Sequence, residues 1–264
     1  MSPIVFLHIP KTAGQAVHNA LVQVVGGQDH VSPVRVREQA QAGRQMPKGY
    51  RLYSGHIDWT EMELLPKERF AFTILRDPRE RIASFYLYMR KLAESCSPQE
   101  LSMPENHGRR MALELSADAY FFGGSDAWHR FVRVMYDNFY CSYFATRRMT
   151  GWGMLENTAQ THRIAQAQTG LKALNAVYTI DQLDMLEHDI AERFGERIQI
   201  AGQYFNTGGH SKGESRWSKL CERFEKDNTR ARLEEFVRLD EVLIQTIGLR
   251  FASTRVDKIS VESS

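Results

Sequence analysis

The fold is decided near the amino terminus, where residues 4–14 read Ile4-Val5-Phe6-Leu7-His8-Ile9-Pro10-Lys11-Thr12-Ala13-Gly14. The first six residues form a short apolar run with β-branched side chains, which predicts a buried parallel strand. Pro10 to Gly14 interrupt this run. Apolar residues then recur at helical spacing from Ala16 to Val24 and stop at Gly26. The stretch therefore predicts a strand, a turn and a helix in succession.

The same arrangement recurs at residues 70–89. Phe70-Ala71-Phe72-Thr73-Ile74-Leu75 predicts a second buried strand, and Arg76-Asp77-Pro78 ends it. Asp77 is a favourable helix N-cap, and Pro78 suits the first helical position. Short strands are also expected at 51–54 and at 176–180, the latter followed by a helix from an Asp181 cap to Phe194. Strands that alternate with helices predict an α/β fold, with a central parallel sheet flanked by helices.

The rest of the chain is less regular. We expect loops at 28–50, which is polar, at 95–110, and at 201–216, which contains several glycines. Helices are expected at 156–172 and 220–247, and the aromatic stretch 128–144 should be mostly helical. The aromatic residues from Trp128 to Phe144 are at helical spacing, which favours a place in the core. Stacking of these rings on a sugar is the alternative.

Composition excludes several classes of protein. Of 264 residues, 42% are hydrophobic and 25% are charged, as in ordinary globular proteins, so a disordered, collagenous or disulfide-scaffold chain is excluded. No apolar run approaches the ~20 residues that span a bilayer, and no signal peptide is predicted. Cys96, Cys141 and Cys221 fit reduced thiols in a cytoplasmic protein and form no metal-site pattern. A net charge of +2 is too small to indicate a nucleic-acid partner.

The turn after the first strand has the features of an anion site. Backbone N–H groups and the helix dipole favour phosphate at a helix N-terminus. Lys11 adds a mobile positive charge, Thr12 adds a hydroxyl, and Gly14 permits close approach of the backbone. The Walker pattern is absent, because no glycine precedes the Lys-Thr pair, so magnesium coordination is not indicated. The alternative is a plain turn with a surface lysine.

The turn after residue 75 offers a second group of polar side chains. Arg76 ends the strand, and Ser84 lies about 9 Å along the helix from Pro78, at 1.5 Å per residue. A guanidinium suits phosphate oxygens, so Arg76 and Ser84 could bind one phosphate. In the alternative, Arg76 and Arg81 pair with Asp77 and Glu80 on a solvated helix start.

Together the two turns carry a family resemblance. Phe6-Leu7-His8-Ile9-Pro10-Lys11-Thr12-Ala13-Gly14 resembles the 5′-phosphosulfate loop of sulfotransferases that use 3′-phosphoadenosine 5′-phosphosulfate (PAPS), closest to the carbohydrate branch with the heparan sulfate 2-O-sulfotransferases. Arg76-Asp77-Pro78-Arg79-Glu80-Arg81-Ile82-Ala83-Ser84-Phe85-Tyr86 resembles the 3′-phosphate motif R-D-P-x-x-R-x-x-S-x-Y. The motifs occur in the family's order and cover the first third of the chain.

The resemblance implies a P-loop-like, three-layer sulfotransferase fold and a set of residue roles. Lys11 would contact the transferring group and stabilise the leaving phosphate. The 5′-phosphosulfate would be held by Lys11, Thr12, Ala13, Gly14, Gln15 and Ala16. Arg76 and Ser84 would hold the 3′-phosphate. The family usually has Thr or Ser at the position of Gln15, whose amide can still donate to phosphate. Lys212 and Arg216, in the basic loop 206–216, are candidates to close over the nucleotide.

The acceptor hydroxyl needs a base with a pKa near neutrality, for which histidine is the usual side chain. His56 follows a short strand and Gly55, at the edge of the sheet where such folds bind ligands. Carbohydrate-specific relatives also have a catalytic histidine at such a place. Asp58 and Glu61 could orient His56, or could simply be solvated.

The sequence therefore predicts a soluble, cytoplasmic, PAPS-dependent O-sulfotransferase with a glycan, glycolipid or other small hydroxyl-bearing acceptor. It would release 3′-phosphoadenosine 5′-phosphate (PAP) and use no metal. We expect one domain over 1–264, with the nucleotide motifs in 1–94, a mostly helical acceptor-side region in 95–176, and a late strand, the basic loop and C-terminal helices in 177–264. The alternatives are a P-loop-type kinase that uses ATP and a non-catalytic nucleotide-binding protein of the same fold.

Overall fold

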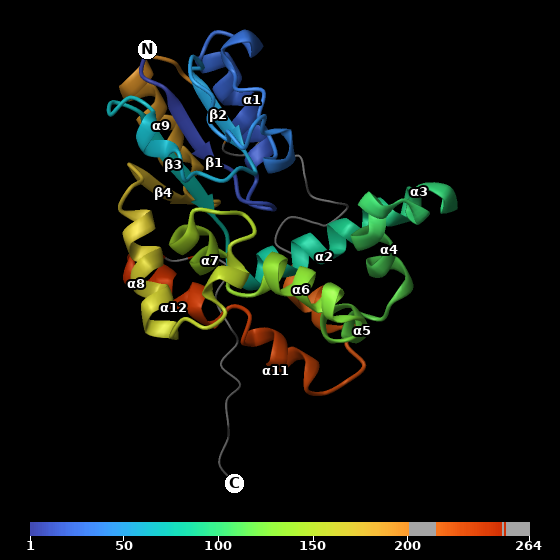
Figure 1. Cartoon of the computed structure of the whole chain (residues 1–264). Helices are drawn as coiled ribbons and strands as arrows, with labels where there is room; N and C mark the ends of the chain where they lie inside the picture. Colours follow the sequence, from blue (N-terminus) through green and yellow to red (C-terminus); the bar gives the residue numbers. More distant parts are fainter. Residues whose placement is uncertain (201–214, 250, 252–264) are drawn as a thin grey trace.

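The computed structural model describes residues 1–200, 215–249 and 251 (Figure 1). Short 3-10 turns at Gln28–His30, Arg37–Gln39, Met62–Leu64, Pro104–Asn106 and Trp152–Leu155 connect the main elements. In chain order the strands and helices are β1 (Ile4–Leu7), α1 (Gly14–Val24), β2 (Leu52–Gly55), β3 (Phe70–Leu75), α2 (Pro78–Glu94), α3 (Pro98–Ser102), α4 (His107–Glu114), α5 (Ala117–Phe122), α6 (Asp126–Tyr136), α7 (Phe139–Thr146), α8 (Gln160–Leu171), β4 (Ala176–Thr179), α9 (Leu183–Phe194), α10 (Arg216–Cys221), α11 (Thr229–Glu234) and α12 (Arg238–Thr246).

The strands form one parallel sheet in the order β2-β1-β3-β4. Ile4 of β1 lies opposite Leu52 of β2 on one side and Phe70 of β3 on the other. Because all the strands run in the same direction, the turns that follow β1, β2 and β3 open at the same edge of the sheet. This edge brings the residues after the three strands together.

Both faces of the sheet are covered by helices, which gives three layers (Figure 1). On one face, Ile4, Phe6 and Phe72 pack with residues of α1 and α9. On the other face, Val5 and Leu7 pack with residues of α7, α8 and α12. The alternation of side chains along β1 accounts for this division, because successive residues of a strand point to opposite faces. The predicted three-layer α/β fold with a central parallel sheet is confirmed.

A third apolar cluster lies beyond the sheet, among α2, α4, α5, α6, α10 and α11. Helix α2 leaves the edge of the sheet and extends into this cluster (Figure 1). Its N-terminus forms as predicted, because the Asp77 carboxylate accepts from the backbone N–H of Arg79 and of Glu80, and Pro78 is the first helical residue. The core placement of the aromatic stretch is also confirmed, since Trp128, Tyr136, Phe139, Tyr140, Tyr143 and Phe144 are buried.

Residues 95–110 are more helical than predicted. Helix α3 begins at Pro98 behind a capping box in which Ser97 accepts from the N–H of Glu100. Helix α4 then begins at His107 and packs against α2. The prolines that indicated a loop instead occupy the first positions of the helical turns, where a missing N–H costs nothing.

Tertiary hydrogen bonds interrupt two of the predicted helices. Between α6 and α7, Asn138 adopts a left-handed conformation, donates its N–H to the carbonyl oxygen of Phe236 at 2.6 Å and accepts from the N–H of Leu239 at 2.7 Å. In the predicted 220–247 helix, Asp118 accepts from the N–H groups of Glu225 and Lys226. These four bonds use backbone N–H groups that a continuous helix would need for its own hydrogen bonds.

Two further boundaries differ from prediction. Residues 28–50 do not simply cross the surface: Val31 pairs with Leu52 and Val36 with His56 in parallel bridges, and Val31 and Val34 are buried. Helix α9 begins at Leu183 with Gln182, not Asp181, at its N-cap position. The first difference places the segment around Val36 directly beside the residue that follows β2.

Candidate active site at the edge of the sheet

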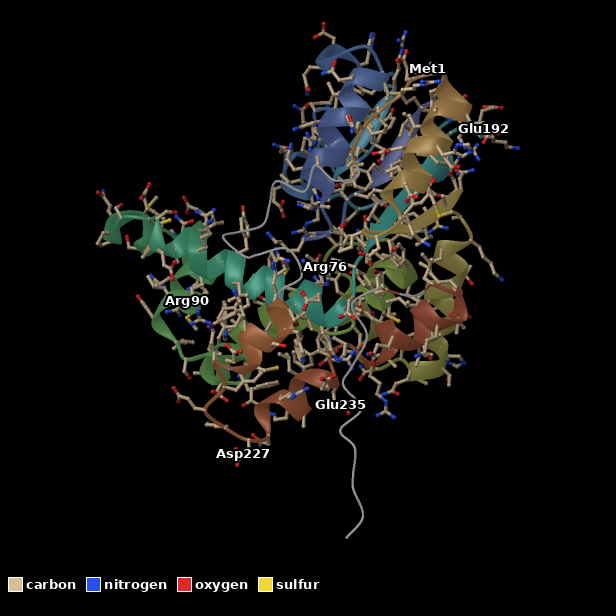
Figure 2. The ribbon with its side chains drawn as sticks, turned by 180° about the vertical axis from the view of Figure 1, so that it is seen from behind. Met1, Arg76, Arg90, Glu192, Asp227 and Glu235 are labelled. Atoms are coloured by element: carbon tan, nitrogen blue, oxygen red, sulfur yellow. The ribbon has the colours of Figure 1, made fainter. Side chains whose placement is uncertain are left out.

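Three predicted site residues follow three adjacent strands. His56 comes after β2, Lys11 after β1, and Arg76 directly after β3. Since the strand order is β2-β1-β3, these residues lie in the order His56, Lys11, Arg76 across the edge of the sheet. Figure 2 shows Arg76 where the sheet meets the helical part, with Arg90 farther along α2.

The turn between β1 and α1 is held in an uncommon backbone conformation. Lys11 and Ala13 have φ angles of 73° and 66°, a left-handed conformation that costs about 1–3 kcal/mol for residues other than glycine and that is concentrated at functional sites. The Thr12 hydroxyl donates to the carbonyl oxygen of Ile9 at 2.9 Å and is fully buried. The N-cap residue of α1 is Ala13, whose methyl side chain offers no hydrogen-bond acceptor to the helix N-terminus. The first N–H groups of α1 therefore point into the turn as possible donors to an anion. The Thr12 hydroxyl already donates its proton to Ile9 within the turn.

Gly14 is required by a neighbour within the chain. A Cβ atom at this position would lie 1.9 Å from the imidazole of His8, so no larger residue fits without displacing that ring. The next residue, Gln15, directs its amide along the helix to Asn19 at 2.9 Å. Ala16 packs against the apolar cluster beneath α1. The sequence predicts that Gly14 lets a ligand approach the backbone closely. In this structure the His8 ring lies at that position.

The Lys11 ammonium lies over the ring of Tyr88, 3.6 Å from its centroid. Burial, followed by the positive charges of Arg216 and Arg76, lowers the pKa of Lys11 to about 8. Lys11, Arg76 and Arg216 come from separate parts of the chain and lie near enough for their charges to interact. A site with such an excess of positive charge is suited to an anion.

Arg76 is nearly buried and oriented by protein groups. Its Nη2 atom donates to the Glu80 carboxylate at 2.8 Å, and its backbone N–H and carbonyl both bond the Tyr140 hydroxyl. Its Nε is buried and finds no partner within residues 1–200, 215–249 and 251. The Arg76–Glu80 pair of the alternative interpretation does form, but in a buried place. Arg81 does not join it, because its guanidinium is buried over the Phe139 ring.

Ser84 lies on a stripe of α2 that connects the two cations. Glu80, Ser84 and Tyr88 are four residues apart, so they share one face of the helix. Arg76 pairs with Glu80 at one end, and Lys11 lies over Tyr88 at the other. At 1.5 Å per residue the stripe is about 12 Å long, with Ser84 midway. The structure therefore brings Lys11, Arg76 and Ser84 to a common surface.

The imidazole of His56 is oriented by His8, the residue that follows β1. Its Nδ1 lies 2.7 Å from the carbonyl oxygen of His8, and the two imidazole centroids are 4.3 Å apart. Because a carbonyl only accepts, Nδ1 carries the proton and the lone pair is on Nε2. Burial lowers the pKa of His56, and the charges of Arg35 and Lys11 lower it further. His56 is thus a neutral imidazole with an unprotonated Nε2.

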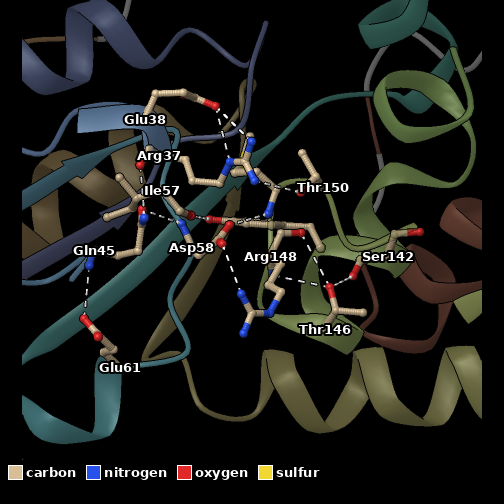
Figure 3. Close-up of polar contacts among 12 residues, drawn as sticks. Arg37, Glu38, Gln45, Ile57, Asp58, Glu61, Ser142, Thr146, Arg148 and Thr150 are labelled. Atoms are coloured by element: carbon tan, nitrogen blue, oxygen red, sulfur yellow. Dashed lines mark hydrogen bonds and ion pairs between the residues drawn. The ribbon is translucent and has the colours of Figure 1, made fainter. Parts of the chain in front are cut away.

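The acidic residues after His56 do not orient it. Asp58 accepts from the N–H of Met149 at 2.8 Å and lies 3.6 Å from the Arg148 guanidinium (Figure 3). Glu61 accepts from the N–H groups of Gln45 and Met46. Neither carboxylate orients His56, so the orienting alternative is excluded, and Asp58 is buried and not solvated. The hydrogen bonds of the two carboxylates connect the chain after His56 to neighbouring loops. The carbonyl oxygen of His8 orients the imidazole of His56.

Sequence reasoning missed a second polar group beside His56. The Arg35 guanidinium donates to Nε2 of His18, and His18 Nδ1 lies 3.1 Å from the Ser54 hydroxyl. Burial lowers the pKa of His18 to about 4, with a further contribution from Arg35. Arg35 is positioned by backbone pairing, because His56 N–H donates to the Arg35 carbonyl at 2.8 Å. No local motif marks this arginine, which lies in the polar stretch 28–50.

The basic loop is described only in part. Arg216 begins α10 and lies close enough to Lys11 to lower its pKa. Lys212 lies outside the described residues. Glu80 and Tyr88 were not predicted as site residues, although their spacing from Arg76 and Ser84 is a detectable signal. Among the residues described, no cluster of histidine, cysteine and acidic side chains is arranged to hold a metal ion.

A family comparison agrees with this geometry. The model of the Sulfotransferase family matches residues 2–243, which include all three strand ends and α2. The chain belongs to the sulfotransferase family. No curated protein matches the sequence of this sulfotransferase. Within its described helices, no segment is both long and apolar enough to cross a bilayer.

Proposed function

We propose that this sulfotransferase moves a sulfuryl group from PAPS to a hydroxyl of a glycan, glycolipid or other small acceptor. The observation that carries the proposal is the convergence of a neutral imidazole, a partly desolvated lysine and a nearly buried arginine at one edge of the sheet. His56, Lys11 and Arg76 follow β2, β1 and β3, which are adjacent strands. We also propose a cytoplasmic protein, with residues 1–264 as one domain.

The polar groups of the site fit the donor. PAPS carries a phosphosulfate on the 5′-oxygen and a phosphate on the 3′-oxygen of its ribose, and the stripe on α2 has a cation at each end. In the proposal, the N-terminal amides of α1 and the Lys11 ammonium hold the phosphosulfate. Arg76 and Ser84 hold the 3′-phosphate, for which the Arg76 Nε, without a partner among the described residues, is a suitable donor. Arg216 and Lys212 would add charge from the basic loop.

Each proposed catalytic group has a defined task. His56 accepts the acceptor's hydroxyl proton at Nε2, while its Nδ1–H remains on the His8 carbonyl. The Lys11 ammonium stabilises negative charge on the leaving phosphate oxygen as the sulfur–oxygen bond breaks. The turn at 10–14 fixes the donor in line with the acceptor oxygen. No metal enters this proposal.

Calorimetric titration with PAP, ADP and ATP–Mg tests the donor assignment. We expect PAP to bind and the two nucleotides without a 3′-phosphate to bind at least about tenfold more weakly, the loss that a charged hydrogen bond of ~1.5–3 kcal/mol predicts. Binding of ATP–Mg alone would contradict the proposal and favour the kinase. Binding of PAP without turnover of PAPS on any hydroxyl acceptor would favour the non-catalytic alternative.

A further inference from the structure

Glu80 is a buried carboxylate that connects two distant parts of the chain. Its Oε2 accepts from Nη2 of Arg76 at 2.8 Å and from the backbone N–H of Arg216 at 3.2 Å. Its Oε1 accepts from the Ser215 hydroxyl at 2.7 Å and from the N–H of Trp217 at 3.1 Å. Only 11% of the Glu80 side chain is exposed. With four donors on two oxygens, this carboxylate is fully engaged by the protein.

These bonds fix the relative position of two arginines. Arg76 directly follows β3, whereas Arg216 begins α10, and 139 residues separate them in the sequence. Both charges act on the Lys11 ammonium, whose pKa they lower together with burial. Like charges repel, so their convergence needs a neighbouring negative charge. Glu80 supplies that charge and also holds the backbone that carries Arg216.

The Glu80 contact uses one donor of the Arg76 guanidinium. A guanidinium has five N–H donors in a planar fork. Glu80 receives only the Nη2 donor, and the buried Nε has no partner among the residues that the structure describes. Glu80 thus holds the fork through Nη2, and the Nε–H next to it remains to be satisfied. Holding a flexible side chain in this way lowers the entropy cost of binding a phosphate.

We propose that Glu80 is a positioning residue that makes the site selective for a nucleotide with a 3′-phosphate, by holding Arg76 and Arg216 in one arrangement. This inference rests on the proposed function, because it takes the 3′-phosphate to be bound by Arg76. Glu80 does not itself touch the nucleotide. A blocking role, in which Glu80 competes with phosphate for Arg76, would have the opposite consequence for affinity.

The test compares binding of PAP and 5′-AMP, which lacks the 3′-phosphate, to the wild-type chain and to Glu80→Gln. The amide keeps an oxygen for Ser215 and Trp217 but removes the charge that holds Arg76. We expect the affinity for PAP to fall about tenfold or more, as for loss of a charged hydrogen bond, and the affinity for 5′-AMP to change less than about twofold. Glu94→Gln is the matched control, because Glu94 pairs with Arg90 at 3.5 Å on the same helix with 56% of its side chain exposed.

The outcomes are distinguishable. A Glu80→Gln protein with unchanged or improved selectivity for PAP would overturn the positioning role, and so would equal losses for both nucleotides, which indicate general misfolding of the site. A second variant, Ser215→Ala, removes the hydroxyl that donates to Glu80 and accepts from the N–H of Ser218. Because it leaves the Arg76–Glu80 pair in place, it should reduce selectivity by a smaller factor. A wild-type chain that does not prefer PAP over 5′-AMP would overturn the proposed function itself, and with it this inference.

Discussion

The carbonyl oxygen of His8 lies 2.7 Å from Nδ1 of His56. The end of β1 therefore fixes the tautomer of the residue that follows β2. The two imidazoles are also in contact, with centroids 4.3 Å apart, and the His8 ring in turn occupies the space above Gly14. The base proposed for the acceptor and the turn proposed for the donor are thus built around one residue.

The activity should extend to lower pH than an ordinary histidine permits. Burial lowers the pKa of His56, with contributions from Arg35 and Lys11, so the neutral form persists below pH ~6.5, the ordinary histidine value. We expect the acid limb of kcat/KM to lie below that value. Steady-state rates from pH 5 to 8 measure it.

Replacement of the imidazole tests the same residue. We expect His56→Gln to lower kcat about 10²–10⁴-fold, the usual contribution of a general base, and to leave PAP affinity almost unchanged. His129→Gln, at an exposed position of α6, is the control and should retain full activity. Normal turnover by His56→Gln would exclude His56 as the base.

Lys11 should produce an alkaline limit. Its pKa is lowered to about 8, chiefly by burial, and only the protonated form stabilises a leaving phosphate. As the pH rises through this value the free enzyme loses the cation, so kcat/KM for PAPS should fall above pH ~8, where the pKa of the free enzyme governs this parameter. In Lys11→Arg the guanidinium stays charged, and this limb should disappear from the residual activity. An alkaline limb that is identical in both proteins would assign it to another group.

Gly14→Ala should damage both halves of the site. The new methyl group would overlap the His8 ring at 1.9 Å, and moving that ring disturbs the support of His56. We expect a loss of about 1–3 kcal/mol in the free energy of unfolding, as for overpacked cores, together with weaker PAP binding. Gly153→Ala is the control, because nothing lies within 4 Å of a Cβ there. Urea denaturation and calorimetry measure the two effects, and equal stability of both variants would contradict the steric argument.

Asp240 should be a stability residue and not a catalytic one. Its buried carboxylate accepts from the N–H groups of Tyr140 and Cys141, at the start of α7. Asp240→Ala would leave both donors unpaired and should lower the free energy of unfolding by about 2–4 kcal/mol. Glu38→Ala, which removes an exposed pair with Arg37, should cost less than about 1 kcal/mol. Chemical denaturation compares them, and similar losses in both would refute the capping role.

Local sequence predicts the parts of this fold that depend on local chemistry. The apolar run Phe70–Leu75 is a strand over its full predicted length, and Asp77 and Pro78 begin α2 as their chemistry requires. The failures occur where distant groups compete for the backbone. Asn138 leaves the helix because Phe236 and Leu239 bond it, and such a contact has no signal in the neighbouring residues.

The candidate site divides in the same way. Lys11, Arg76 and His56 were predictable because each follows a strand, and parallel strands end at one edge. Arg35 was not, since it reaches the site through bridges between Val36 and His56 that join separate segments. The sequence left the roles of Asp58 and Glu61 open, because proximity in sequence to His56 does not reveal that their carboxylates accept from the N–H groups of Met149 and Gln45.

The position of β2 at one end of the sheet has an evolutionary consequence. In the proposed enzyme the donor is held by β1 and β3, which are interior strands, whereas His56 follows a strand whose outer neighbours are single bridges from Val31 and Val36. Mutations and insertions in 28–50 can therefore reshape what is presented to His56 while the donor half is inherited intact. Related proteins can therefore change their acceptor specificity through residues beside β2 alone, without changes in β1 and β3.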